Sequence, residues 1–252
     1  MDLGLKGKRV LVTGGTRGIG AAIVRCFLNE GADVAFCARN AEEVEATSKE
    51  LQSRGFKALG SSCDVSGAAA LAEWIQASVE ALGGIDIFVP NVSGGAQQGE
   101  EGWKSAFEVD LMATVRGCDT ALPYLAASDA GAIVVIASIA GLEAFGGPSA
   151  YNTIKAGLVS YASQLGAAAA PHGVRVNTVS PGPIHVDDGF WGAVQRTNKE
   201  AYDATASRHP MGRLGSVEEV ANCVAFLASP VANWVTRANL VVDGGFLNRV
   251  QF

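Results

Sequence analysis

The chain alternates short runs of apolar, often β-branched residues with longer stretches in which apolar residues recur every three or four positions. Nearly unbroken apolar runs are typical of strands covered on both faces, as in a parallel sheet, and the longer stretches are typical of helices. Strands are expected at residues 9–13, 33–37, 57–61, 85–89, 132–136, 174–179 and 239–242, of which the third is the weakest. Helices are expected at residues 18–30, 41–54, 67–82, 100–127, 149–170 and 216–228.

Seven strands with intervening helices predict a single-domain, doubly wound α/β (Rossmann) fold with a seven-stranded parallel sheet and helices on both faces. No Pro/Ser-rich linker, charge block or internal repeat divides residues 1–252, so we expect one domain. The alternation breaks down between about residues 181 and 213, which we predict to be irregular. This stretch carries Phe190, Trp191 and Tyr202, and we interpret residues 183–213 as a substrate lid.

Composition narrows the classes of partner. Hydrophobic residues make up 48% and charged residues 17%, which excludes global disorder, and the net charge of −6 provides no overall basic surface for nucleic acid. Five scattered cysteines with no C-x-x-C pair predict free thiols in a reducing, cytoplasmic compartment and no metal site. The start of the chain lacks the apolar stretch of a signal peptide, and no apolar run approaches the roughly 18 residues of a membrane span. We therefore expect neither nucleic acid nor membrane as a partner.

A glycine-rich turn follows the first strand and opens the first helix, with the sequence Thr13-Gly14-Gly15-Thr16-Arg17-Gly18-Ile19-Gly20. Gly14 permits a tight turn, Gly18 lets the backbone approach a ligand, and Gly20 lets the helix pack close to the sheet. The helix N-terminus then offers free N–H groups to a diphosphate. A plain glycine-rich turn is the alternative, but the place of this turn in the first βα unit favours a dinucleotide site.

The end of the second strand bears on the choice of nicotinamide cofactor. NAD binding usually requires a carboxylate there, which accepts a hydrogen bond from the ribose 2′-hydroxyl. This chain instead has Cys37-Ala38-Arg39-Asn40. Arg39 and Arg17 could converge on a 2′-phosphate, whose oxygens match a guanidinium fork. NADP(H) is favoured over NAD(H), and two solvated surface arginines are the alternative.

A group of three residues, later in the chain, suggests proton transfer. Tyr151 and Lys155 lie four positions apart at the start of a predicted helix and so share one face. A phenol is a poor base at neutral pH, and a neighbouring ammonium favours its phenolate form. Ser138 follows the fifth strand, at the edge where α/β proteins bind ligands, and could hydrogen-bond a substrate oxygen. A Tyr-x-x-x-Lys pair alone is a common accident, so the prediction depends on the combination with Ser138 and the glycine turn.

Together these features resemble the short-chain dehydrogenase/reductase family across essentially the whole chain, and they are most similar to its 3-oxoacyl-carrier-protein reductase-like members. Further matching segments are Cys63-Asp64-Val65, Asn91-Val92-Ser93-Gly94, Asn177-Thr178-Val179-Ser180-Pro181-Gly182, Gly212-Arg213-Leu214-Gly215 and Val242-Asp243-Gly244-Gly245. The resemblance implies reversible hydride transfer between NAD(P)(H) and a carbonyl/alcohol pair, in a homotetramer or homodimer.

The resemblance also implies roles at the cofactor. Asp64 and Val65 would flank the adenine, Asn91 would support the ribose side, Lys155 would hold the nicotinamide ribose, and Ile184 would meet the carboxamide through its backbone. With the glycine turn and the two arginines, the expected cofactor-binding set is Gly14, Thr16, Arg17, Gly18, Ile19, Gly20, Arg39, Asn40, Asp64, Val65, Asn91, Tyr151, Lys155, Pro181, Gly182 and Ile184.

The chain departs from the family pattern at Asp110, where asparagine is usual. In the family this asparagine helps to hold a water that connects the lysine to solvent. Aspartate is nearly isosteric but cannot donate a hydrogen bond unless protonated, and its charge would stabilise Lys155 and weaken the effect of the lysine on Tyr151. We therefore add Asp110 to Ser138, Tyr151 and Lys155 as a predicted catalytic residue, with an altered pH dependence. Arg237 stands where glycine often precedes the last strand.

The substrate is the least determined feature. The expected substrate contacts are Ser138, Tyr151, Phe145, His185, Phe190 and Trp191. A small-molecule carbonyl or alcohol is expected, and an acyl-carrier substrate would need a basic docking patch, for which Arg116, Arg196, Lys199 and Arg208 are candidates. Two alternative functions stay open: an NAD-dependent alcohol dehydrogenase, and a non-catalytic dinucleotide-binding sensor, which the presence of Ser138, Tyr151 and Lys155 disfavours.

Overall fold

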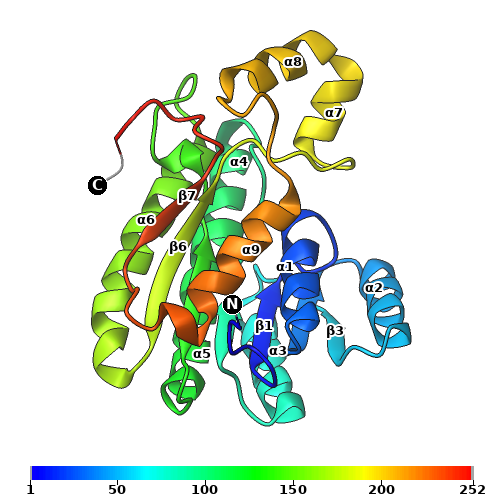
Figure 1. Ribbon diagram of the computed structural model, residues 1–252, viewed down its shortest axis with the longest axis vertical. Coiled ribbons are helices and arrows are strands. Elements are labelled where there is room, and N and C mark those ends of the chain that lie inside the picture. Colours follow the sequence, from blue (N-terminus) through cyan, green and yellow to red (C-terminus); the bar gives the residue numbers. More distant parts are fainter. Residues whose placement is uncertain (1, 251–252) are drawn as a thin grey trace.

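The computed structural model describes residues 2–250, so only Met1 and residues 251–252 of the predicted domain lie outside the described residues. Its strands form one parallel sheet in the order β3-β2-β1-β4-β5-β6-β7, and the predicted fold class is confirmed (Figure 1). The strands are β1 (Arg9–Thr13), β2 (Asp33–Ala38), β3 (Ala58–Ser62), β4 (Ile87–Val89), β5 (Ala132–Ile136), β6 (Arg175–Pro181) and β7 (Asn239–Val242).

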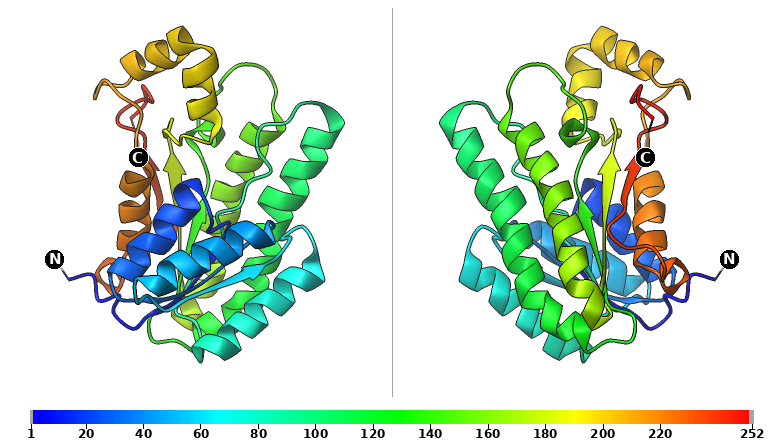
Figure 2. Two further views of the ribbon diagram at one scale, coloured as in Figure 1. Left: turned by 90° about the vertical axis from the view of Figure 1, so that its right-hand side faces the viewer. Right: turned by 90° about the vertical axis from the view of Figure 1, so that its left-hand side faces the viewer.

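Alternating side chains of the strands build a separate apolar core on each face of the sheet. Val10 and Phe36 belong to the core on one face, whereas Leu11 and Phe88 belong to the core on the other. The first core is covered by α1 (Gly18–Asn29), α2 (Ala41–Ser53) and α9 (Val217–Ala228), and the second by α3 (Ala68–Leu82), α5 (Ala113–Ala126) and α6 (Ala150–Ala169) (Figure 2). Within residues 2–250, no helix combines the length and the apolar character that crossing a bilayer requires.

The helix predicted over residues 100–127 is interrupted. It consists of α4 (Gly99–Ser105), a π-helical segment over Ala106–Met112, and α5. A π-helical turn holds more residues than an α-helical one and so changes which side chains face inward. Ala106 and Asp110 are the buried residues of this segment.

The prediction of an irregular stretch over residues 181–213 was wrong. The structure forms two helices there, α7 (Phe190–Thr197) and α8 (Lys199–Arg208), which pack on one another beyond the carboxyl ends of the strands (Figures 1 and 2). None of the residues Lys199–Arg208 is buried, so α8 has no apolar stripe that could reveal it in the sequence. The available signal was Asn198, whose side chain accepts the Ala201 N–H as an N-cap.

Arg237 explains why glycine is common just before the last strand. It has φ +62° and is the one non-glycine residue with positive φ among residues 2–250. Its N–H donates to the Val176 carbonyl at 2.7 Å, and its Nε donates to the Ser163 carbonyl on α6 at 3.1 Å. These bonds hold a left-handed conformation that glycine would adopt without strain.

Candidate active site

The glycine turn adopts the geometry that its sequence predicts. Gly14 and Gly18 have φ +71° and +54°, in the left-handed region that favours glycine. The Gly14 and Gly15 N–H groups donate to the Cys37 carbonyl at 2.8 and 3.0 Å, which ties the turn to the end of β2. A Cβ atom at Gly20 would overlap the Gly14 carbonyl oxygen. The turn therefore brings the N-terminus of α1 close to the edge of the sheet.

The N-terminus of α1 is left without a side-chain cap. Arg17 occupies the N-cap position and makes no capping hydrogen bond within residues 2–250. Side chains cap α2, α6 and α9, whereas α3, α4 and α7 share with α1 the absence of a side-chain cap in the described chain. The first N–H groups of α1, and the positive end of its dipole, are thus available to an anion such as a diphosphate.

Asn91 is part of this turn. Its Nδ2 donates to the Thr13 and Gly14 carbonyls at 3.0 and 3.2 Å, and its backbone N–H donates to the Thr13 hydroxyl at 3.0 Å. The side chain expected at the cofactor ribose therefore joins the end of β4 to the glycine turn.

Two exposed arginines lie near this turn: Arg17 at the start of α1 and Arg39 just after β2. Neither Arg17 nor Arg39 forms an ion pair with another residue in the described range 2–250. Hydrogen bonds from the backbone and hydroxyl of Ser66 lower the pKa of Asp64, and the positive charge of Arg39 adds to this effect, so Arg39 and Asp64 lie near one another. Asn40 uses its side-chain oxygen to cap α2, and the Thr16 hydroxyl donates to Glu43 at 3.2 Å.

Ser138 and Lys155 meet at the end of β5. Ser138 lies two residues after the end of β5, is 8% exposed, and accepts the Ala140 N–H on its Oγ at 3.1 Å. Lys155 is buried in α6, and its Nζ donates to the Ile136 carbonyl at 3.3 Å, two residues before Ser138. Tyr151 lies one turn earlier on α6, with its ring centroid 5.6 Å from the Lys155 Nζ. Tyr151, Lys155 and the segment that carries Ser138 therefore come close together at this edge of the sheet.

Asp110 joins this group from the π-helical segment. Its Oδ1 lies 3.0 Å from the Lys155 Nζ, and the two side chains are 1% and 3% exposed, respectively. Its Oδ2 accepts the Gly94 N–H at 2.7 Å. The contact with Gly94 was not anticipated from the sequence, because Asp110 and Gly94 are 16 residues apart and only the fold brings them together.

Pro181 ends β6, and the loop that follows, which carries Gly182 and Ile184, is held on two sides. A Cβ atom at Gly182 would lie 2.7 Å from the Asp243 Cβ, so glycine is required where this loop passes the end of β7. The Gly215 N–H donates to the Pro183 carbonyl at 3.0 Å, and the His185 N–H donates to the Gly215 carbonyl at 2.8 Å.

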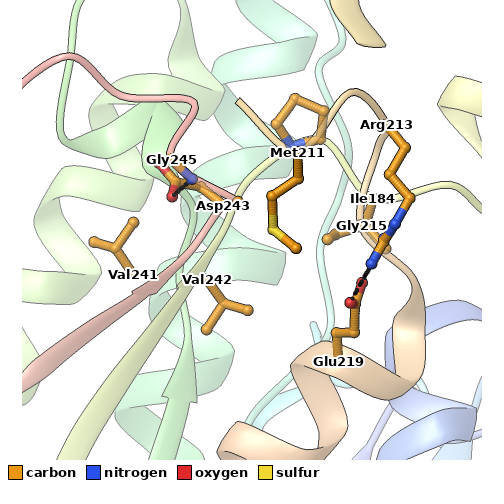
Figure 3. Close-up of a pocket in the computed structure, with 11 residues that line it drawn as sticks. Ile184, Met211, Arg213, Gly215, Glu219, Val241, Val242, Asp243 and Gly245 are labelled. Carbon is orange, nitrogen blue, oxygen red and sulfur yellow. Dashed lines mark hydrogen bonds and ion pairs between the residues drawn. The ribbon is translucent and has the colours of Figure 1, made fainter. Parts of the chain in front are cut away.

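A cavity of about 320 Å³ lies beside this loop, between the end of β7 and the start of α9 (Figure 3). Figure 3 shows the Met211 side chain over the cavity and the Arg213–Glu219 ion pair, of 2.6 Å, on its far wall. Pro183 and Ile184 line this cavity, whereas Ser138, Tyr151 and Lys155 are absent from its lining within the described chain.

The expected substrate residues fall into two groups. His185, Trp191 and Phe190 lie in the segment predicted to form a lid, residues 183–213. The Tyr202 hydroxyl shares a hydrogen bond with His185 Nδ1 at 3.1 Å, and the centroid of the Trp191 ring lies 5.2 Å from that of the 72% exposed Phe190. Tyr202 thus belongs to the same group.

Phe145 lies instead in the loop after Ser138. It packs in one cluster with Ile139 and with Phe246, whose ring centroid is 6.1 Å away. Phe246 was not predicted, because it follows the last strand and nothing in its local sequence marks it.

Comparison with known proteins agrees with this geometry. Residues 14–247 match the family model described as "Enoyl-(Acyl carrier protein) reductase". Isoepoxydon dehydrogenase of Penicillium expansum is 39% identical over 100% of this chain and 99% of its own length. The chain belongs to the short-chain dehydrogenase/reductase family.

Other short-chain dehydrogenases/reductases match along their whole length too. The 3-oxoacyl-[acyl-carrier-protein] reductase of Chlamydia pneumoniae is 32% identical over 97% of this chain and 99% of its own. The L-sorbose reductase of Gluconobacter frateurii, whose crystal structure is a complex with NADPH and L-sorbose, superposes with a TM-score of 0.92 at 30% identity, over 99% of this chain and 100% of that one. As a member of this family, the protein is an oxidoreductase, which confirms the predicted class of activity.

Proposed function

We propose that this short-chain dehydrogenase/reductase transfers a hydride between NADP(H) and a small-molecule ketone or secondary alcohol. The observation that carries the proposal is the meeting of Ser138, Tyr151 and Lys155 at the end of β5, on the same sheet edge as the uncapped N-terminus of α1. Bound cofactor would donate or accept the hydride, and the protein would position the reactants and move the proton.

Each side chain has a role that its contacts support. The Ser138 Oγ accepts a backbone N–H, which leaves its own proton free to donate to the substrate oxygen. Tyr151 would give that oxygen its proton in reduction and take it back in oxidation. Lys155 would hold the ribose hydroxyls and favour the charged form of Tyr151, and Asp110 would hold Lys155.

The residues around the glycine turn and the end of β2 fit the diphosphate and 2′-phosphate of an NADP(H) molecule. The free N–H groups of α1 match a diphosphate, and Arg17 and Arg39, without ion-pair partners in the described chain, match a 2′-phosphate. Pro181, Gly182 and Ile184 would complete the nicotinamide end. In support, the similar L-sorbose reductase is a complex with NADPH.

Replacing Arg39 tests the preference. Arg39→Asp should raise the Kd of NADPH by more than about tenfold and change the Kd of NADH much less, because the lost contact concerns the phosphate alone. Arg54→Asp removes an exposed arginine at the other end of α2 and is the matched control. A native protein that binds NADH more tightly than NADPH would favour the NAD-dependent alternative.

A small substrate is better supported than an acyl carrier. Three of the four cations considered for a docking patch are already engaged: Arg116 pairs with Glu108, Lys199 pairs with Asp203, and Arg196 donates to the Asp187 carbonyl. The names of two similar proteins denote small substrates, isoepoxydon and L-sorbose, although that of the Chlamydia pneumoniae protein denotes an acyl-carrier substrate. We propose that the lid, residues 183–213, and Phe145 line the site of a compact, oxygen-rich substrate.

Tyr151→Phe tests the reaction itself. In a panel of ketones and alcohols that includes L-sorbose, followed by NADPH absorbance, the variant should lose at least about 100-fold in turnover, because it lacks the transferable proton. NADPH binding, measured by fluorescence, should persist. A native protein that binds NADPH and turns over no panel member would instead favour the non-catalytic sensor.

The assembly and location are part of the proposal. The exposed small residues Ala167, Ala168 and Ala170 at the end of α6 would allow close helix–helix approach between subunits, which supports a homotetramer or homodimer. Light scattering after gel filtration would measure this. The five free thiols support a reducing compartment, the cytoplasm.

A further inference from the structure

A buried ion pair lies at the centre of the candidate site. The Asp110 Oδ1 and the Lys155 Nζ are 3.0 Å apart, and their side chains are 1% and 3% exposed. Charges in such a place are poorly screened by water, so each acts strongly on its neighbours. A neutral residue at position 110 would leave the ammonium charge uncompensated.

Two contacts hold Asp110 in this orientation. The π-helical segment turns Asp110 inward, while its neighbours Phe107 and Glu108 face outward, with Phe107 46% exposed and Glu108 paired with Arg116. The second carboxylate oxygen of Asp110 accepts the Gly94 N–H at 2.7 Å. The Gly94 hydrogen bond therefore holds one carboxylate oxygen, while the other has no hydrogen-bond partner among the described residues and lies at ion-pair distance from Lys155.

Lys155 is close to both its anionic partner and Tyr151. Its Nζ is 3.0 Å from the carboxylate and 5.6 Å from the Tyr151 ring centroid. A phenolate on Tyr151 would therefore experience an ammonium and a carboxylate whose fields oppose one another. The groups that hydrogen-bond to the pair within the described chain, the Gly94 N–H and the Ile136 carbonyl, do not titrate. The titratable groups gathered here are therefore the two members of the pair and Tyr151.

We propose that Asp110 acts as a positioning residue whose charge offsets that of Lys155, and that it thereby moves proton exchange at Tyr151 to higher pH than a neutral residue would. The inference rests on the proposed role of Tyr151 as acid and base. The acid limb of alcohol oxidation and the alkaline limb of carbonyl reduction both report proton exchange at Tyr151, so both should move in the same direction. A neutral side chain at position 110 should move both limbs to lower pH by about one unit or more.

The test follows Tyr151 directly by the near-ultraviolet absorbance of tyrosinate, in the full-length protein, with and without saturating NADP⁺. The chain has four tyrosines, and subtracting the titration of Tyr151→Phe isolates the one of interest. Burial raises the pKa of Tyr161 above that of an exposed tyrosine. This readout needs no substrate.

Asp110→Asn and Asp110→Ser both remove the charge, and both should lower the Tyr151 midpoint by about one unit. Two replacements keep the test valid if one of them fails to fold, which thermal melting would show. Glu108→Gln is the matched control, because it removes an equal charge from the same segment where the carboxylate pairs with Arg116, and its midpoint should equal that of the native protein.

Unchanged or raised midpoints in the Asp110 variants would overturn the inference, as would an equal shift in Glu108→Gln or the absence of a Tyr151 titration. Failure of the proposed function looks different. A lowered midpoint in a protein that turns over no ketone or alcohol would sustain the electrostatic inference and contradict the reaction. Turnover with unmoved midpoints would do the reverse.

Discussion

At Gly20 the backbone leaves no room for a side chain, because a Cβ atom would overlap the Gly14 carbonyl oxygen and approach the Asn91 amide at 2.5 Å. Gly20→Ala should therefore force the glycine turn away from α1, with a loss of at least about 2 kcal/mol in the free energy of unfolding and weaker NADPH binding. Urea denaturation and nucleotide titration would measure the two effects.

The matched control is Gly157→Ala. Gly157 is a helical residue of α6, and a Cβ atom there meets nothing within 4 Å. Alanine should stabilise the protein at this position by about 0.5–1 kcal/mol, because glycine is a poor helix former. A Gly20→Ala variant as stable as the native protein would show that the turn adapts and that its glycine pattern is not required by packing.

At the scale of elements, Asp86 connects the start of β1 with the segments that flank β4 and β5. Its carboxylate accepts hydrogen bonds from the Arg9 backbone at 2.8 Å, from the Arg9 guanidinium at 2.8 and 2.9 Å, and from the Ser128 hydroxyl at 2.6 Å. Burial alone would raise the pKa of Asp86, but the bonds from Arg9 and Ser128 outweigh it and lower the pKa from 3.8 to about 2. The folded state therefore binds this proton less readily than the unfolded chain does.

This contribution to stability should be fully present above about pH 4 and should disappear as the pH falls toward 2. Asp86→Asn should cost about 2 kcal/mol at neutral pH and remove that part of the acid dependence, as urea unfolding between pH 6 and pH 3 would show. Glu45→Gln, which removes an exposed carboxylate paired with Lys49, should leave the slope nearly unchanged. Equal acid dependence in the native protein and Asp86→Asn would contradict this account.

The lid is the element expected to move. Helices α7 and α8 pack on each other, and none of the residues of α8 is buried. At the entrance to the lid, the Val186 side chain lies next to Gly18 of the glycine turn, 3.8 Å from where a Cβ atom would stand. We expect the amides of residues 190–208 to exchange with deuterium faster than those of α6, and NADPH to slow them. Equal protection of α7–α8 and α6 without cofactor would contradict a mobile lid.

How far the sequence predicted these elements depended on burial. All seven strands were located to within about two residues. The inner strands, covered on both faces, leave apolar runs in the sequence, whereas the partly exposed edge strand β3 gave the weakest signal. The helices of the lid were missed, because α8 buries nothing and so carries no apolar period. The π-helical segment was missed because it changes which side chains of the helix face inward. Asp110 is buried as a result, and the spacing of apolar residues alone could not show this.

At the scale of the whole molecule, the sheet couples the two apolar cores. Neighbouring residues of one strand, such as Val10 and Leu11, belong to opposite cores, so neither face can lose its helices without exposing the strands that the other face needs. The proposed nucleotide contacts also span the molecule, from Arg39 at the end of β2 to Ile184 after β6. We therefore expect nucleotide binding to stabilise the fold as one unit.

Calorimetry should show a single unfolding transition that NADPH raises. At a free concentration about 100-fold above its Kd, NADPH should add about 2.7 kcal/mol to the free energy of unfolding, and for a chain of this size each kcal/mol raises the Tm by about 2–4 °C. NADH at the same concentration should raise the Tm less, because it lacks the phosphate for Arg17 and Arg39. A separate transition for one face of the sheet would show that the two cores are not coupled. Equal Tm shifts with NADPH and NADH would show that Arg17 and Arg39 do not select the cofactor.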